Sequence, residues 1–292
     1  MFNSDNSKIN FVLFSAPFLL MYSLFFLIPM IMGVWYSFTD WNGMSGNYQI
    51  VGLSNYIRCF QDARFLQSFI FTFKYTGLYT VTANILALIL AVCTSRNTRN
   101  NTALRAVFFT PNVLNLATVG FIWQFILGTL NTGLYKMTGW PVFEISWLNN
   151  KDIVLYTVTI VRVWVSVGYL MVIYIAGIQG IDSAVREAAI VDGAVGFKLF
   201  SNITFPLIMP AVTSCIFISL VTSLKIFPLL LTLTNGGPGH YSESVSLNAY
   251  REAFENYRFG YASAKAMLFT VVILVITGIQ LVVSKRRESD IA

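Results

Sequence analysis

The chain has 292 residues, of which 56% are hydrophobic and only 11% are charged, and its mean hydropathy is +0.66. Soluble domains carry about 25% charged residues, so a water-soluble fold would have to hide more apolar surface than it could bury. The solvent that accepts such a chain is the lipid bilayer. The net charge of +6 comes from basic residues scattered between apolar runs, which indicates membrane topology and not nucleic-acid binding.

Six apolar runs, each longer than the ~20 residues that cross the hydrocarbon core, predict an all-α integral membrane protein with six transmembrane helices. The runs are Phe11–Phe38, Ser68–Cys93, Ala106–Leu130, Ile153–Ile178, Leu207–Leu233 and Ala262–Val283. The first run is longer than the apolar region of a signal peptide, so we expect it to be retained, with a kink near Pro29.

The distribution of lysine and arginine predicts the orientation of these helices. With the N-terminus inside, the inner segments carry more basic residues than the outer loops, and Lys285, Arg286 and Arg287 follow the last span. Basic residues near the ends of spans favour the cytoplasmic side. We therefore expect both termini in the cytoplasm.

Four basic residues fall within the apolar runs. We expect Lys74 and Lys265, near the outer ends of their spans, to extend their amines to the membrane surface. Arg162 and Lys225 lie deeper, where a charge costs about 3 kcal/mol and indicates either a water-filled path or a structural pair. If they line the path, they favour an anionic substrate such as a uronate or a phosphorylated polyol.

Other candidates for the substrate path are Trp123, Asn115 and Asn84, because sugars bind to aromatic faces and amides. Helix packing is the competing explanation for each of these three residues. The spans contain no deep carboxylate, and the single histidine, His240, falls in an outer loop. This pattern counts against the alternative function, an ion- or proton-coupled secondary transporter.

Catalysis and metal binding find no support in the sequence. It contains no nucleophile–base pair, no paired carboxylates and no metal-ligand spacing. The three cysteines, Cys59, Cys93 and Cys215, are far apart and predict neither a disulfide framework nor a zinc site. We therefore expect no enzyme activity, no metal and no directly bound cofactor.

The loop between spans four and five predicts a short helix. Asp182 or Ser183 can cap its start, and Gly193 is a natural left-handed terminator. Ala184 and Ala188 lie on one face, where small side chains allow close approach of a partner. A helix lying on the membrane surface is the alternative, but it would favour large apolar residues and lysines.

This loop also resembles a known motif. Glu187-Ala188-Ala189, then Gly193 after three residues, then Ile203 and Pro206, is similar to the EAA loop of binding-protein-dependent ABC importer permeases. The departures are Phe205 where leucine is usual and Asp182 where many relatives have proline.

The resemblance implies a type I importer permease fold in the bacterial cytoplasmic membrane. It implies that ATP is used by a separate ATPase dimer, which contacts the loop residues Glu187, Ala188, Ala189, Asp192 and Gly193. It further implies a second permease subunit, an extracytoplasmic solute-binding protein and a sugar substrate.

A second stretch, Asn235-Gly236-Gly237-Pro238-Gly239, predicts a tight turn after span five and lacks the spacing of a phosphate-binding loop. It resembles the outer loop of sugar permeases that pair with a second permease, although Pro228 stands where relatives often carry an acidic residue. We expect three regions: residues 1–67 with the first span, 68–285 as the transport domain, and 286–292 as a cytoplasmic tail.

Overall fold

The computed structural model describes residues 14–289, without the side chains of Val142 and of residues 285–289. The beginning of the first predicted span, residues 11–13, and both chain ends lie outside this range. The chain divides into two compact units, one made of residues 14–62 and 249–270, the other of residues 63–248 and 271–289.

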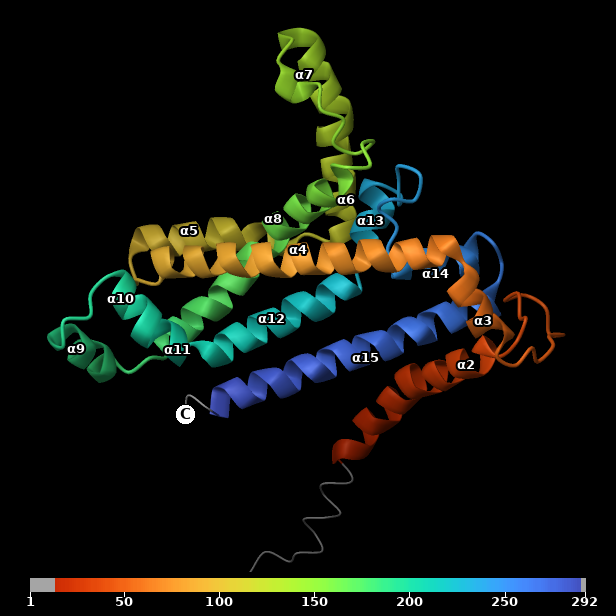
Figure 1. The fold of residues 1–292 in the computed structure, drawn as a ribbon, viewed down its shortest axis with the longest axis horizontal. Coiled ribbons are helices and arrows are strands. Elements are labelled where there is room, and N and C mark those ends of the chain that lie inside the picture. The colour runs from red at the N-terminus through yellow and green to blue at the C-terminus, as the bar shows by residue number, and fades with distance from the viewer. Residues whose placement is uncertain (1–13, 290–292) are drawn as a thin grey trace, which may run out of the picture. The chain divides into compact units, whose positions relative to one another are not determined.

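The described chain is helical, and its only extended pairing is an isolated bridge between Thr39 and Ile50. In chain order the helices (Figure 1) are η1 (Ser23–Leu27), α2 (Ile28–Ser37), α3 (Ser54–Gln61), α4 (Ala63–Thr94), α5 (Arg99–Phe109), η2 (Thr110–Val113), α6 (Leu116–Gln124), η3 (Phe125–Leu130), α7 (Asn131–Thr138), η4 (Pro141–Phe143), α8 (Val154–Gln179), α9 (Ser183–Val191), α10 (Phe197–Leu199), η5 (Phe200–Thr204), α11 (Phe205–Leu207), α12 (Met209–Leu224), α13 (Pro228–Leu233), α14 (Val245–Phe254) and α15 (Phe259–Ser289).

Four uninterrupted helical runs are long and apolar enough to cross a membrane, and two bent helix pairs raise the number of candidate spans to six. The uninterrupted runs are Phe14–Ser37, Ala63–Thr94, Val154–Gln179 and Phe259–Ser284. They correspond to predicted spans one, two, four and six. The all-α membrane class is therefore confirmed.

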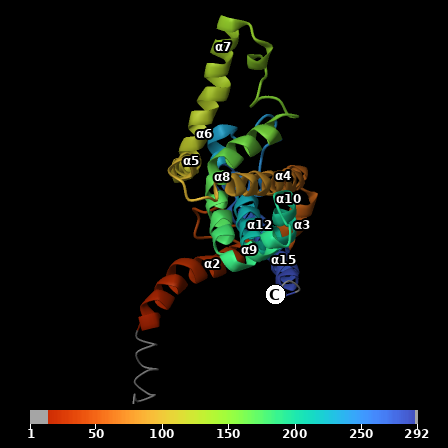
Figure 2. The ribbon, with the colours of Figure 1, turned by 90° about the vertical axis from the view of Figure 1, so that its left-hand side faces the viewer.

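The third predicted span, Ala106–Leu130, is not the continuous helix that we expected. Helices Arg99–Val113 and Leu116–Thr138 meet at an angle of 93°. Pro111 lies in the 3₁₀ turn before the break, and the Asn115 side chain accepts a hydrogen bond from the Ala117 amide at 2.9 Å, which starts a new helix. Beyond the break, α6, η3 and α7 form one continuous projection (Figures 1 and 2).

The fifth predicted span, Leu207–Leu233, is also interrupted. Helices Phe197–Leu207 and Met209–Leu224 are bent by 71°. A second break follows α12, and α13 begins at Pro228. Proline at the start of a helix cannot donate the backbone hydrogen bond that would continue the preceding one. The predicted start of the span, Leu207, lies at the first break, whereas hydropathy misses the second break because α12 and α13 are both apolar.

The core of the second unit lies where α4, α8 and α12 pack together. Asn84 of α4 connects all three, because its amide donates to Ser219 of α12 at 2.8 Å and accepts from Tyr174 of α8 at 2.8 Å. At Gly168 of α8 the backbone approaches Phe108 of α5 so closely that a Cβ would collide with the Phe108 carbonyl. Small and hydrogen-bonded polar residues are the usual means by which helices associate in lipid.

In the first unit, the expectation that Lys265 reaches the membrane surface is wrong. Its side chain is 0% exposed, and its amine lies 2.9 Å from an Asp62 carboxylate oxygen and 3.4 Å from one of Glu252. The Tyr261 ring lies 4.4 Å from the same amine. The carboxylates come from segments outside the span, so an apolar run read alone gives no sign of them. A buried amine requires such partners.

Candidate coupling loop and outer pocket

The helix predicted in the loop between spans four and five is present as α9, which lies between the end of α8 and the start of α10 (Figure 1). Its start is fixed by Asp182, whose side chain accepts a hydrogen bond from the Ala184 amide at 2.9 Å. This is the N-cap arrangement, in which a side-chain oxygen satisfies one of the free amides of the first turn. The predicted start is therefore confirmed.

The end of α9 is closed by a Schellman motif. Gly193 has a φ of +83°, and its amide donates to the Ile190 carbonyl at 3.0 Å. The Ala194 amide donates to the Ala189 carbonyl at 2.9 Å. These are the two bonds that define the motif, and they require a left-handed residue between the helix and the following chain. The spacing of Gly193 from Glu187-Ala188-Ala189 is thus explained by the geometry of the helix end.

The predicted contact residues do not all share the same environment. Glu187, Ala188 and Asp192 are exposed, whereas Ala189 is 8% exposed and uses its carbonyl to close the helix end. Among the described residues, neither Glu187 nor Asp192 forms an ion pair. Both carboxylates are therefore available to a partner.

An exposed apolar surface, which sequence reasoning missed, accompanies these carboxylates. Val191 is 85% exposed, Val195 is 65% exposed and Phe197 is 81% exposed. Apolar side chains that protrude beside charged ones are typical of a protein-binding surface. The sequence signal was present, since Val191 is the last residue of the helix and Val195 and Phe197 follow the predicted end within a few positions.

The predicted path residues are not gathered at one place. The Asn84 amide makes the interhelical bonds described above, and the Asn115 side chain caps α6. Trp123 of α6 packs edge-on against Trp164 of α8, with ring centroids 5.5 Å apart. Each of these three residues thus has a structural contact of its own.

The two deep basic residues differ in their surroundings. Arg162 of α8 is half-buried, and its guanidinium carbon lies 5.6 Å from the centre of the Tyr79 ring of α4. Lys225 ends α12, is exposed, and forms no ion pair with the residues that the structure describes. Lys225 is therefore a path candidate whose charge remains available among the described residues.

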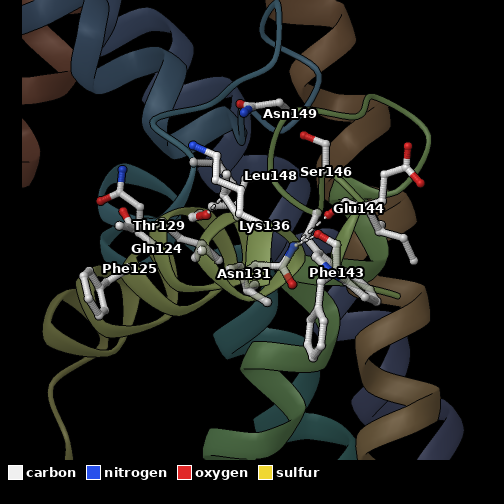
Figure 3. Close-up of a pocket in the computed structure, with 18 of the residues that line it drawn as sticks. Gln124, Phe125, Thr129, Asn131, Lys136, Phe143, Glu144, Ser146, Leu148 and Asn149 are labelled. Atoms are coloured by element: carbon white, nitrogen blue, oxygen red, sulfur yellow. Dashed lines mark hydrogen bonds between the residues drawn. The ribbon is translucent and has the colours of Figure 1, made fainter. Parts of the chain in front are cut away.

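A pocket of about 920 Å³ lies between the projection formed by α6, η3 and α7 and the segment that leads into α8 (Figure 3). The polar residues that line it include Gln124, Thr129, Asn131, Lys136, Glu144, Ser146 and Asn149. Aromatic residues Phe125, Phe143 and Trp147 lie among them. The predicted topology places this pocket on the outer side of the membrane.

Asn131 holds the shape of this pocket. Its side-chain amide donates to the carbonyls of Phe143 at 2.9 Å and Ile145 at 3.1 Å, which ties the returning segment to α7 (Figure 3). The side chains of Lys136 and Glu144 form no ion pair within the described part of the chain, so both signs of charge remain available. Amides, hydroxyls and aromatic rings around one hollow suit a hydroxylated ligand.

The fold and the loop define a class: a multi-pass helical membrane protein whose short capped helix presents a binding surface at the ends of its spans. The family described as binding-protein-dependent transport system inner membrane component matches residues 83–289. The chain therefore belongs to this family. It is a non-catalytic permease subunit of the inner membrane and works in an ABC complex with a binding protein and an ATPase.

Two related permeases match this chain over nearly its whole length. It is 37% identical over 280 residues to the probable starch degradation products transport system permease protein AmyD of Thermoanaerobacterium thermosulfurigenes, covering 95% of this chain and 94% of that protein. It is 30% identical to the multiple sugar-binding transport system permease protein MsmF of Streptococcus mutans, with coverages of 92% and 93%.

A solved structure has the same fold. A chain of a bacterial ABC transporter involved in the import of the acidic polysaccharide alginate superposes with a TM-score of 0.82 at 22% identity, covering 97% of this chain and 98% of that one. The predicted type I importer permease fold is thereby confirmed.

Proposed function

We propose that the chain is the translocation subunit for a sugar or a short oligosaccharide. Three relatives that are 30% or more identical to it are described as permeases for starch degradation products, for multiple sugars and for diacetylchitobiose. The outer pocket, with its amides, hydroxyls and aromatic rings, has the chemistry that a carbohydrate requires. The relatives and the pocket support the same substrate class.

The ATPase dimer docks on α9, and the exposed, doubly capped helix is the observation that carries this assignment. Glu187, Ala188, Asp192 and Gly193 lie on or beside the docking surface, and Ala189 supports it through its carbonyl. Because α9 is joined to α8 by only three residues, movement of the ATPase is passed directly to a membrane span. A second permease subunit completes the pore, and regions 1–67, 68–285 and 286–292 act as first span, transport domain and tail.

Charge reversal at Glu187 tests the docking assignment. We expect Glu187→Lys to insert and fold normally but to lose ATPase capture and sugar uptake, because a cation replaces an exposed carboxylate at the proposed contact. Purification of the complex and uptake into proteoliposomes measure both effects.

Asp152→Lys is the matched control, since Asp152 is an exposed acidic residue immediately before α8, on the predicted outer side. The docking assignment fails if Glu187→Lys recruits the ATPase and imports sugar like the unaltered chain, or if Asp152→Lys is equally defective.

The sign of the substrate's charge is tested at Lys225, whose amine is exposed and without an ion pair among the described residues. If Lys225 lines the path, Lys225→Ala reduces uptake of acidic sugars about tenfold and leaves neutral sugars unaffected, because one charge-assisted hydrogen bond is lost. Equal losses for both groups of sugars would contradict a specific role. Competition with a panel of neutral sugars, uronates and phosphorylated polyols measures the difference.

A further inference from the structure

A second hollow, of about 540 Å³, lies on the α9 side of the second unit. It is bounded by the end of α4, the end of α8, the start of α9 and the segment that contains η5. The Gln179 side chain donates to the Ser95 carbonyl at 2.9 Å, so the ends of α4 and α8 are tied together at its wall. The hollow is therefore built by helices that meet at the proposed coupling loop.

The charged residues that line this hollow are all basic. Arg96 and Arg186 both line it, and no aspartate or glutamate does. Neither guanidinium makes a hydrogen bond or an ion pair with any residue that the structure describes. The nearby Arg105 shows the usual alternative, since its Nε donates to the Thr94 carbonyl at 3.0 Å and its guanidinium closes the end of α4. Arg96 and Arg186 make no such contact within the described part of the chain.

The start of α9 adds a polar group to the wall. Ser183, the first residue of this nine-residue helix, lines the hollow and offers a hydroxyl donor. Asp182 lies beside it, but its side chain is engaged by the Ala184 amide and does not line the hollow. The remaining wall includes Ile178, Ile181 and Phe200, which are apolar.

We propose that this hollow binds a phosphate-bearing anion between Arg96 and Arg186. Two guanidinium groups without a partner among the described residues suit the tetrahedral oxygens of a phosphate, because arginine presents several fixed donors to one anion. The phosphate belongs either to an anionic phospholipid of the adjacent leaflet or to a soluble phosphorylated compound. Basic pockets between helix ends on the cytoplasmic side are suited to lipid head groups.

Binding of the anion restricts the movement of α9, the helix that connects the proposed ATPase contact to the membrane spans. Arg186 is on α9 and Arg96 follows α4, so one phosphate held by both connects the coupling helix to a membrane span. This consequence rests on the proposed function, because it assumes that α9 docks an ATPase. The anion site itself does not, since it is defined by residues of this chain alone.

Two binding arms distinguish the two sources of phosphate. The full chain is placed in nanodiscs of phosphatidylcholine, alone or mixed with phosphatidylglycerol, and native mass spectrometry measures retained phosphatidylglycerol. In the phosphatidylcholine discs, calorimetry measures the binding of inorganic phosphate. We expect at least one arm to be positive, together with slower hydrogen exchange of the α9 amides.

The variants Arg96→Gln and Arg186→Gln each weaken this binding about tenfold, as expected for the loss of one charge-assisted hydrogen bond. Arg99→Gln is the matched control, because Arg99 begins α5 in the same inner segment but does not line the hollow. Phosphatidylglycerol retention alone identifies a lipid, and phosphate binding alone identifies a soluble compound.

The proposal is overturned if neither probe binds, or if Arg99→Gln weakens binding as much as the two pocket variants. Both binding arms use the permease without ATPase or sugar. A chain that binds the anion but fails to recruit the ATPase would refute the proposed function and leave the anion site standing.

Discussion

Replacement of Gly193 by alanine is the sharpest test of how α9 is held. Gly193 has a φ of +83°, and a Cβ placed there would meet nothing within 4 Å. The substitution therefore creates no collision, and its whole effect is the backbone strain of a left-handed alanine. That strain is about 1–2 kcal/mol, which lowers the population of the closed helix end about 5- to 30-fold.

Hydrogen exchange of the Ala194 amide, which donates to the Ala189 carbonyl at 2.9 Å, measures this population directly. We expect faster exchange in Gly193→Ala, with weaker ATPase capture and slower sugar uptake at unchanged membrane insertion. Gly193→Asn is expected to be milder, because asparagine tolerates the left-handed region better than alanine does.

Gly139→Ala is the matched control for strain. Gly139 ends α7 with a φ of +66°, also has open space around its Cβ position, and lies far along the chain from the coupling loop. Normal Ala194 exchange and normal uptake in Gly193→Ala would refute the Schellman explanation of the motif. An equal loss of uptake in Gly139→Ala would show that strain at any helix end has this effect.

Two further predictions concern buried groups outside the coupling loop. Glu243 is 1% exposed and binds Arg64 through two contacts of 2.7 and 2.9 Å, so we expect Glu243→Gln to lower the free energy of unfolding by about 3 kcal/mol. The control Glu255→Gln, at a pair whose carboxylate is 55% exposed, should change it by less than about 1 kcal/mol in the same thermal unfolding assay, and equal effects would contradict the argument. Burial raises the pKa of the Cys59 thiol to about 11, so below that pH the thiol stays protonated and its reactive thiolate becomes abundant only as the pH approaches 11. With Cys59 as the single cysteine, maleimide labelling near pH 8 should be slow in the native chain and complete after unfolding, whereas rapid native labelling would show that the thiol is accessible and ionised.

The sequence was most informative where the physical cause is local. Hydropathy summed over about 20 residues predicts spans one, two, four and six, because crossing the bilayer depends on each segment's own composition. Asp182 and Gly193 predict both ends of α9 correctly, because capping involves only residues within one or two turns. The resemblance to the EAA loop rests on the same short segment.

Tertiary structure decided what depends on distant partners. Lys265 is buried because Asp62 and Glu252 reach it from other segments, and the Asn84 amide is engaged because Ser219 and Tyr174 face it across the bundle. Such contacts form only when residues far apart in sequence pack together, whereas membrane insertion and helix capping are already encoded in each segment.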